Sequence, residues 1–224
     1  IKVNLRARCY RPVTGPTGSG KTTTLYSALK TLSTSEVNLT TIEDPIEMVY
    51  DRFNQTAVQP HIGVTFASSL RTILRQDPDI IMVGEIRDLI GVPSFLINST
   101  LIGVVAQRLV RKVCHYCVEQ YNLSEDECYV LGINYDKFKN IKVSIGRGCP
   151  QCRGTGYLGR TGIFEVMEIT ERIRSAIDNK ATPSDIKKIA KGEGLITLRE
   201  CAVKKMLKGI TTFDEVIRVT GLLG

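Results

Sequence analysis

An eight-residue, glycine-rich run limits the possible folds of this chain more strongly than any other segment. The run is Gly15-Pro16-Thr17-Gly18-Ser19-Gly20-Lys21-Thr22, and it matches the full G-x-x-x-x-G-K-[ST] spacing of phosphate-binding loops. Apolar residues recur at helical spacing over residues 25–32, so we expect the loop to open into a helix whose N-terminus faces phosphate. The alternative is a glycine-rich turn that merely caps a helix, and the complete spacing disfavours it.

The loop residues have separate expected roles. The expected nucleotide is ATP or ADP. Lys21 is expected to contact the β- and γ-phosphates of ATP, and the Thr22 hydroxyl to bind Mg²⁺. The residues before the loop depart from the usual pattern, because Arg8, Arg11 and Pro12 stand where a buried strand is expected. The full set of expected nucleotide contacts is Gly15, Pro16, Thr17, Gly18, Ser19, Gly20, Lys21, Thr22 and Thr23.

Two glutamates follow predicted strands. Residues 37–42 alternate loosely and lead into Glu43, and the apolar run after Asp79 leads to Glu85. Open parallel sheets place their chemistry at such carboxyl ends. We expect one glutamate to orient or deprotonate the attacking water and the other to hold Mg²⁺ through water, and we assign Glu85 with Thr22 to the Mg²⁺ site. The alternative is a pair of solvated acids at strand ends.

Three arginines are candidates for phosphate contacts. Arg71 and Arg75 share one face of a helix predicted over residues 66–76, and Arg87 follows Glu85. Such arginines can reach a γ-phosphate bound by a neighbouring subunit. A solvated cationic face explains the first two equally well, so both interpretations stay open.

Four cysteines form two C-x-x-C pairs. Cys114 pairs with Cys117, and Cys149 pairs with Cys152. Two such turns supply the four thiolates of a closed tetrahedral site, which suits structural Zn²⁺. The alternatives are reduced cysteines that only pack, or a redox-active pair. Small, buried apolar positions are predicted for the other three cysteines: Cys9, Cys128 and Cys201.

A formal G-x-G-x-x-G run occupies residues 154–159. A dinucleotide-binding fingerprint must follow a strand and open a helix. Here the run follows a predicted metal-binding turn and precedes residues 161–169, which alternate like a strand. We therefore expect these glycines to form turns around the cysteine module.

The C-terminal quarter of the sequence predicts helices over residues 171–180, 185–194, 197–209 and 211–220. Each segment has an apolar face for packing and a basic outer face. No catalytic residue is predicted here. The basic residues form either a solvated surface or a docking surface for anionic partners, and they include Lys187, Lys188, Lys191, Lys204, Lys205 and Lys208.

The composition is that of a soluble globular protein. Of the 224 residues, 42% are hydrophobic and 24% are charged, which excludes disordered and collagen-like chains. The apolar stretch over residues 95–106 is too short to cross a bilayer, and the N-terminal residues lack an export signal, so we expect a cytoplasmic protein. The formal charge of +7 favours anionic partners such as nucleotides, nucleic acid or acidic lipids.

Several motifs together resemble the secretion ATPases of type II secretion and type IV pilus assembly. They are GPTGSGKTTTLY, TIEDPIE, FASSLRTILRQDPDIIMVGEIRD and AQRLVRKVC, in the order of that family, and the resemblance runs from about Gly15 to Thr220. The resemblance implies a cytoplasmic homohexamer, peripheral to the inner membrane, that docks on a membrane platform. ATP hydrolysis by this ring would then power pilus assembly or protein secretion.

The resemblance also implies roles for single residues. Glu43, Asp44 and Glu47 match the family's Asp box, and Glu85 stands in its Walker B motif, where Gly84 replaces the usual Asp. The family carries a tetracysteine zinc module at the same place, which favours an assembly or secretion motor over a retraction motor. Arginines that family members place near nucleotide or at subunit contacts match Arg71, Arg75 and Arg87.

Two departures from the family stand out. Family members carry a His box with a catalytic-site histidine, whereas here Leu89 runs directly into Ile90, and neither His61 nor His115 matches that box. The family's N-terminal domain is reduced to a remnant. We expect that segments of a longer protein are missing near residue 10 and between Leu89 and Ile90. If the deletions are genuine, we expect an inactive hydrolase.

These observations predict an α/β protein with a RecA-like P-loop NTPase core, a small tetracysteine zinc module and a C-terminal helical subdomain. Four segments are expected. Residues 1–11 are an N-terminal remnant, residues 12–112 the core, residues 113–158 the zinc module, and residues 159–224 the C-terminal strand and helices. Two other functions stay open, a nucleic-acid motor with a zinc ribbon and a nucleotide-binding adaptor without turnover. We expect no nucleic-acid partner, because the chain has no Trp and only 6% aromatic residues to stack bases. The missing His box would favour the adaptor.

Overall fold

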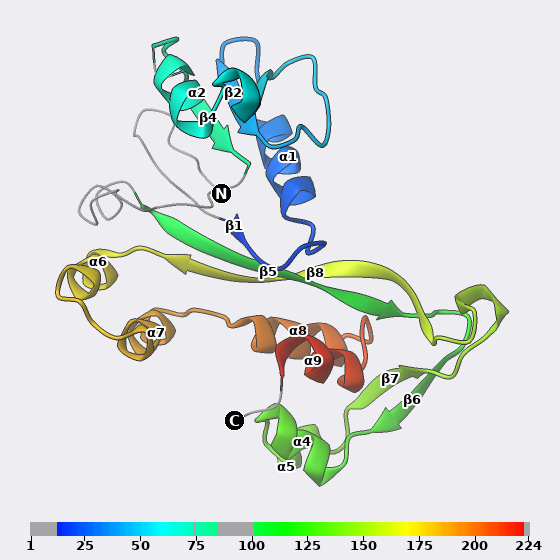
Figure 1. Ribbon diagram of the computed structural model, residues 1–224. Helices are drawn as coiled ribbons and strands as arrows, with labels where there is room; N and C mark the ends of the chain where they lie inside the picture. The colour runs from blue at the N-terminus through cyan, green and yellow to red at the C-terminus, as the bar shows by residue number, and fades with distance from the viewer. Residues whose placement is uncertain (1–12, 74, 85–100, 222–224) are drawn as a thin grey trace. The chain divides into compact units, whose positions relative to one another are not determined.

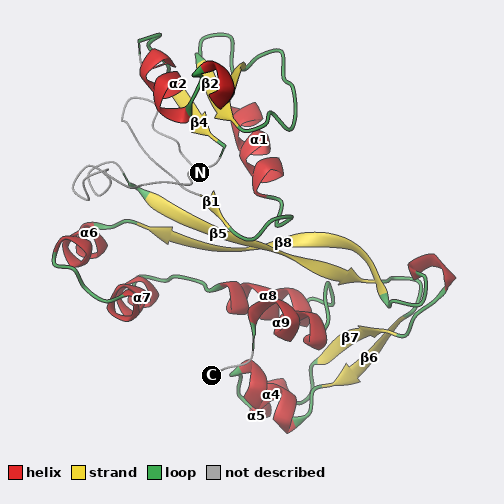
Figure 2. Ribbon diagram, viewed as in Figure 1, coloured by secondary structure: helices red, strands yellow, loops and turns green. Residues whose placement is uncertain are grey.

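The computed structural model describes residues 13–73, 75–84 and 101–221, and its elements are labelled in Figure 1 and coloured by type in Figure 2. The described residues form two compact units. One is Thr22–Leu101, and the other combines residues 13–21 with residues 102–221. The four segments expected from the sequence stay a prediction.

The first unit is built on a parallel three-stranded sheet in the order β3-β2-β4. Its strands are β2 (Leu39–Glu43), β3 (Asn54–Ala57) and β4 (Ile80–Val83). Every residue of the central strand β2 is buried, as is usual for a parallel strand that is paired on both edges. The strands predicted before Glu43 and after Asp79 are therefore confirmed.

Helices and an aromatic cluster complete this unit. The helices are α1 (Lys21–Leu32), α2 (Phe66–Ile73) and the short 3-10 helix η1 (Pro60–Ile62). Tyr26 of α1 packs against Tyr50 and Phe53, with ring centroids 5.4 and 5.9 Å away. Leu29, Leu39 and Met82 belong to the same buried core. The helix predicted after the loop is confirmed, and the helix predicted over residues 66–76 is present as α2, which spans Phe66–Ile73.

A mixed three-stranded sheet, ordered β1-β5-β8, forms the base of the second unit. The short strand β1 (Val13–Thr14) is parallel to β5 (Gly103–Val113), and β5 is antiparallel to β8 (Tyr157–Glu168). The β5–β8 register shifts between Arg111 and Val113. The strand predicted over residues 161–169 is confirmed, and it begins earlier than expected.

The cysteine module carries a two-stranded antiparallel ribbon, β6 (Val118–Asn122) and β7 (Lys142–Gly146). Between these strands lie α4 (Glu125–Leu131) and α5 (Tyr135–Phe138), and the 3-10 helix η2 (Pro150–Cys152) follows β7. Ser124 and Glu127 form a capping box that starts α4. Gly154 and Gly156, with φ values of 77° and 75°, lie in the predicted turns, whereas Gly159 falls within β8.

Four C-terminal helices follow β8: α6 (Glu171–Asp178), α7 (Pro183–Gly192), α8 (Leu198–Leu207) and α9 (Phe213–Thr220). Each begins after a threonine whose side chain accepts a hydrogen bond from a backbone N–H in the first turn. The four predicted helices are therefore confirmed, with ends shifted by a few residues. The capping threonines are Thr170, Thr182, Thr197 and Thr212.

One core joins the sheet, the cysteine module and the last two helices of this unit. Val110 of β5, Ile163 of β8, Met206 of α8 and Val216 of α9 are all fully buried in it. Cys128 of α4 lies in the same core, which confirms its predicted buried position, whereas Cys201 packs against the core and is only partly buried. Cys9 lies outside the described residues. Among the helices of the described residues, none is long and apolar enough to cross a membrane.

Candidate functional site

The predicted phosphate loop connects β1 to α1. Its backbone turns where the Ser19 N–H donates to the Pro16 carbonyl at 3.1 Å. The Lys21 ammonium donates to the carbonyl oxygens of Gly15 and Pro16 at 2.9 and 3.1 Å. Because α1 begins at Lys21, the loop immediately precedes a helix N-terminus, where free peptide N–H groups favour anions. The nucleotide contacts expected from the loop, and the Mg²⁺ contact of Thr22, stay predictions.

Strand β5 fastens the loop through Gln107. This side chain is buried, and its Nε2 donates to the Ser19 carbonyl at 2.9 Å. A Cβ at Gly15 would lie 2.2 Å from the Gln107 carbonyl oxygen, so only glycine fits where the loop passes β5. The sequence motif AQRLVRKVC contains Gln107, but a contact across 88 positions leaves no local signal in the sequence.

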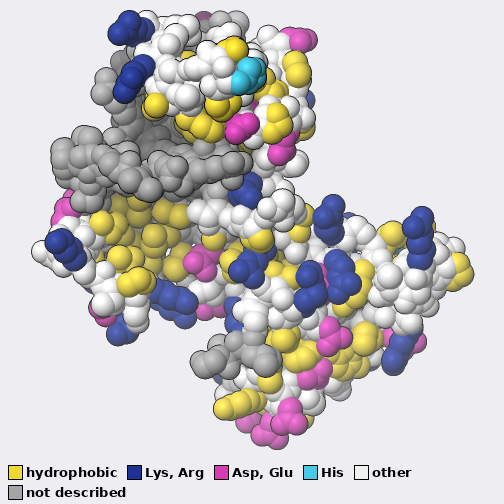
Figure 3. All heavy atoms as spheres, viewed as in Figure 1, with side chains coloured by type: hydrophobic (Ala, Val, Ile, Leu, Met, Phe, Trp, Pro, Cys, Tyr) yellow, Lys and Arg dark blue, Asp and Glu magenta, His cyan; other side chains and the backbone are white. Residues whose placement is uncertain are grey.

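A cleft of about 270 Å³ opens beside the loop, within the second unit. Residues 16–19 of the loop line it together with apolar groups of Leu109 and Val219. Figure 3 shows Lys and Arg side chains gathered on this unit where β8 passes α8. Guanidinium groups bind phosphate through paired hydrogen bonds, so the lining suits a phosphate-bearing ligand. The arginines of the cleft, to which the sequence alone assigns no role, are Arg108, Arg111, Arg160 and Arg218.

Glu43 ends the central strand of the first unit and is only 3% exposed. Its carboxylate accepts hydrogen bonds from the Tyr26 hydroxyl at 2.7 Å, the Thr41 hydroxyl at 2.6 Å and the Gln55 amide at 3.2 Å. Burial, followed by the hydrogen bond to Glu43, raises the pKa of Tyr26, so its hydroxyl keeps the proton that it donates. Glu43 is therefore a buried, oriented carboxylate and not a solvated acid at a strand end.

The Glu43 side chain lies against Gly84, directly after β4. A Cβ at position 84 would lie 3.3 Å from Glu43 Cγ and 3.4 Å from Glu43 Cα. Any larger residue at position 84 would therefore press on Glu43, and an aspartate there would compete with Glu43 for the same space. The close contact gives a physical reason for the glycine at position 84, where the sequence predicts a Walker B motif.

The remaining predicted site residues are placed differently. Glu85 and Arg87 lie outside the described residues. Arg71, near the end of α2, and Arg75, just beyond it, are both exposed. The loop belongs to the second unit and Glu43 to the first. The catalytic, Mg²⁺ and arginine roles of these residues stay predictions.

The four predicted zinc ligands come together. All four Sγ atoms lie within 4.8 Å of one another. The Sγ–Sγ distances are 3.8 Å for Cys114–Cys149, 3.9 Å for Cys117–Cys152 and 3.6 Å for Cys149–Cys152. Sulfurs at about 2.3 Å from a tetrahedral ion stand about 3.8 Å apart, so the cluster has the dimensions of a four-thiolate zinc site.

Backbone N–H groups surround these sulfurs. The N–H of Gly148 donates to Cys117 Sγ at 3.3 Å, and Cys152 Sγ accepts from the N–H groups of Cys149 and Gly156 at 3.1 and 3.2 Å. Burial raises the pKa of the Cys117 thiol to about 12, whereas at Cys152 the two donors outweigh burial and lower the thiol pKa to about 6. Metal ions bind thiolates, so the N–H donors around Cys152 favour the form of this side chain that binds a metal ion.

Comparison with known proteins now adds to this geometry. The family model described as "Type II/IV secretion system protein" matches residues 3–90 and 89–218 of the chain. The two matched stretches overlap at residues 89 and 90, the junction at which a missing His box is expected from the sequence.

Two relatives illustrate the similarity. The type IV pilus assembly ATPase TfpB of Acinetobacter baylyi is 40% identical over 244 residues, which cover 94% of this chain and 42% of that protein. The type II secretion system protein E of Pseudomonas aeruginosa is 40% identical over 242 residues, which cover 93% of this chain and 48% of that protein. The chain thus spans less than half the length of each of these relatives.

Solved structures agree on the fold. The pilus retraction motor PilT with bound ADP matches with a TM-score of 0.63 and 22% identity, covering 94% of this chain and 61% of that one. The ATPase DotB of Legionella pneumophila matches with a TM-score of 0.60 and 20% identity, covering 94% and 59% of the two chains. The fold is therefore the α/β fold of these ATPases, as predicted. Taken with the family match over most of the sequence, these findings show that the chain belongs to the type II/IV secretion system protein family.

Proposed function

We propose that this chain binds ATP with Mg²⁺, hydrolyses it, and uses hydrolysis to drive type II secretion or type IV pilus assembly. The observation that carries the proposal is the phosphate loop, which β5 fastens beside an arginine-lined cleft. Family membership supports the same activity, because relatives that are 40% identical are named as a pilus assembly ATPase and a type II secretion protein.

In this proposal each part of the chain has one task. The loop N–H groups and Lys21 bind the phosphates, and Thr22 with Glu85 holds Mg²⁺, which neutralises phosphate charge during hydrolysis. Glu43, a carboxylate held rigidly by neutral donors, orients the attacking water. The rigid shell supports this task, since a pre-oriented acid loses little entropy in the reaction.

The motor itself is proposed as a homohexameric ring in the cytoplasm, docked on an inner-membrane platform of the secretion or pilus machine. Arg71, Arg75 and Arg87 would act at subunit contacts or on nucleotide. Subunits with ATP and with ADP would differ in the relative orientation of their parts, and the ring would pass that movement to its membrane partner.

The test is steady-state ATP hydrolysis by the purified chain beside its Lys21→Ala and Glu85→Gln variants. We expect turnover that depends on Mg²⁺, loss of nucleotide binding in Lys21→Ala, and bound but unhydrolysed ATP in Glu85→Gln. ATP binding by the wild-type chain without any turnover would support the adaptor instead. Turnover that rises on addition of DNA, with salt-sensitive DNA binding, would support a nucleic-acid motor.

We also propose that the cysteine cluster holds one structural Zn²⁺. Its four ligands leave no open position, so the ion would stabilise the module and take no part in catalysis. Metal analysis is expected to find one zinc per chain. Mutation of Cys149 and Cys152 to Ser should abolish zinc binding and lower the melting temperature, and an unchanged melting temperature with no bound metal would contradict the proposal.

A further inference from the structure

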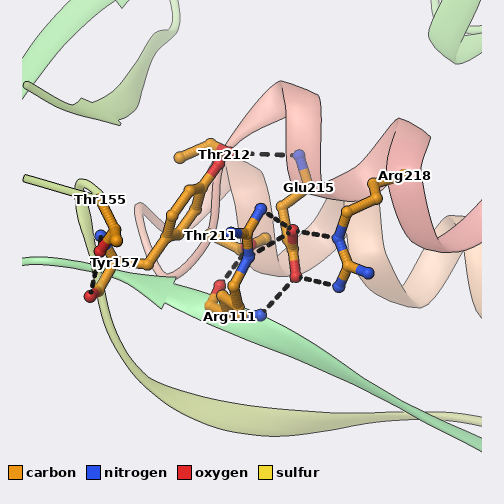
Figure 4. A network of polar contacts seen from close by, with 7 residues as sticks. All are labelled: Arg111, Thr155, Tyr157, Thr211, Thr212, Glu215 and Arg218. Carbon is orange, nitrogen blue, oxygen red and sulfur yellow. Dashed lines mark hydrogen bonds and ion pairs between the residues drawn. The ribbon is translucent and has the colours of Figure 1, made fainter.

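The second unit contains a fully buried carboxylate, Glu215, that lies between two arginines (Figure 4). Arg218 donates to its two oxygens through Nε at 2.7 Å and Nη2 at 2.6 Å. Arg111 donates through Nε at 2.9 Å and forms an ion pair through Nη2 at 2.8 Å. Two guanidinium groups are thus held by one carboxylate.

The same carboxylate ties helix α9 to strand β5. Glu215 Oε1 accepts a hydrogen bond from the backbone N–H of Arg111 at 2.7 Å, and the Thr211 hydroxyl donates to the Arg111 carbonyl at 2.8 Å. These bonds hold the backbone of β5 at the point where the β5–β8 register shifts. Arg111 is therefore fixed at its backbone as well as at its guanidinium group.

The plane of the Arg111 guanidinium is also fixed. Its central carbon lies 3.9 Å from the ring centre of Tyr157, a stacking distance. The Tyr157 hydroxyl lies 2.7 Å from the hydroxyl of Thr212, the residue that caps α9. Figure 4 shows the ring of Tyr157 on one side of Arg111 and Glu215 on the other.

The bonds to Glu215 leave part of each guanidinium free for a ligand. A guanidinium has five N–H donors, and Glu215 uses two of those on each arginine. The Arg111 and Arg218 side chains remain 41% and 55% exposed, and both line the cleft beside the phosphate loop. Four arginines face this cleft with one buried carboxylate behind them, so the lining keeps an excess of positive charge.

We propose that Glu215 is a positioning residue for nucleotide binding, which holds the Arg111 and Arg218 guanidinium groups toward the phosphates of a nucleotide in the cleft. The inference rests on the proposed function. Glu215 itself touches no ligand; it fixes two flexible side chains before binding, and so removes the entropy loss that their ordering would otherwise require.

The experiment is titration of the full chain with AMP-PNP and Mg²⁺ by calorimetry, at a temperature where circular dichroism shows every variant folded. Glu215→Gln should weaken binding about tenfold, the loss expected when charge-assisted hydrogen bonds are broken. The matched control is Val216→Ala, a fully buried neighbour on the same helix, which should lower the melting temperature and leave affinity within about twofold of wild type.

A second variant keeps the inference testable if Glu215→Gln fails to fold. Arg218→Lys retains the charge of a half-exposed side chain but loses the paired bonds to Glu215, and it should weaken binding several-fold. Glu215→Gln should reduce AMP-PNP affinity by a smaller factor in the Arg218→Lys background than in the wild-type background, because the two residues act together.

The outcomes separate the two proposals. Wild-type affinity in both Glu215→Gln and Arg218→Lys would overturn the positioning role alone. An equal loss of affinity in Val216→Ala and Glu215→Gln would also overturn it, because general loosening of α9 would then suffice. Two results would overturn the proposed function and this inference with it. One is a wild-type chain that binds no AMP-PNP, and the other is a Lys21→Ala variant that binds AMP-PNP as tightly as wild type.

Discussion

Two buried glutamates, one in each unit, are surrounded by opposite kinds of donor. Glu43 is 3% exposed, and its donors among the described residues are hydroxyl and amide groups. Glu215 is 0% exposed and accepts from two guanidinium groups and a backbone N–H. Neutral donors orient a carboxylate without adding an opposite charge. Arginines add an opposite charge and become oriented themselves. Equal burial therefore supports two tasks, chemistry at Glu43 and the arrangement of cations at Glu215.

The largest expected effect is the loss of turnover in Glu43→Gln. The substitution keeps the shape of the side chain and replaces its carboxyl group by an amide. We expect kcat for ATP hydrolysis to fall at least about 100-fold, the usual contribution of a positioned acid or base, with AMP-PNP affinity unchanged. Turnover within about threefold of wild type would show that the buried carboxylate is structural only.

Next in size is the effect of acid on the stability that Glu215 contributes through its bonds to Arg111 and Arg218. Burial would raise the pKa of this carboxyl, but hydrogen bonds from Arg218 and Arg111 outweigh it and lower the pKa from 4.5 to about 2. A lowered folded-state pKa contributes stability that is complete above pH 4.5 and is lost as the pH falls toward 2.

Urea unfolding at several pH values measures this contribution. Glu215→Gln should be less stable than wild type by about 2 kcal/mol at pH 7, and the difference should shrink between pH 4.5 and pH 2. A difference that stays constant over that range would mean that the arginines do not stabilise the charged form.

Tyr26→Phe tests the neutral shell of Glu43 and should have a smaller effect. The variant removes one of three donors, so Glu43 keeps its bonds to Thr41 and Gln55 but is held less firmly. We expect kcat to fall about tenfold, as for loss of one hydrogen bond to a charged group. Tyr50→Phe, a change in the same aromatic cluster, is the control and should leave kcat unchanged; equal losses in both variants would argue against a role of the Tyr26 hydroxyl.

The smallest expected effect comes from the helix caps. Thr212→Ala and Thr197→Ala each remove an N-cap and should each cost about 1 kcal/mol of stability. Only Thr212 also contacts Tyr157, which stacks on Arg111. A small loss of AMP-PNP affinity is therefore expected in Thr212→Ala and not in Thr197→Ala. The same loss in both variants would contradict a role of Thr212 in holding Tyr157 and Arg111.

Local patterns in the sequence predicted local parts of the structure well. The helix after the loop, the clustering of the two C-x-x-C pairs and the four C-terminal helices each depend mainly on patterns of residues close together in the chain, and each is found in the structure. The nucleotide contacts of the loop stay predictions. The β6–β7 ribbon with α4 and α5 went unpredicted, although the capping box from Ser124 to Glu127 marked the start of α4.

Long-range contacts explain what the sequence did not predict. Glu215 meets Arg111 across 104 positions, and Gln107 meets the loop across 88, so neither partner lies near the other in the sequence. The Asp-box motif drew attention to Glu43 but not to Tyr26 or Gln55, because the pairing of β2 with β3 and the packing of α1 are needed to bring them together. Tertiary structure alone supplies these contacts.

The most direct test of the difference between the two glutamates is a parallel measurement of kcat and KM for ATP in Glu43→Gln and Glu215→Gln. We predict that Glu43→Gln lowers kcat with little change in KM, and that Glu215→Gln raises KM about tenfold with little change in kcat. The same pattern in both variants, or the reverse assignment, would contradict the division of chemistry and cation positioning between the two units.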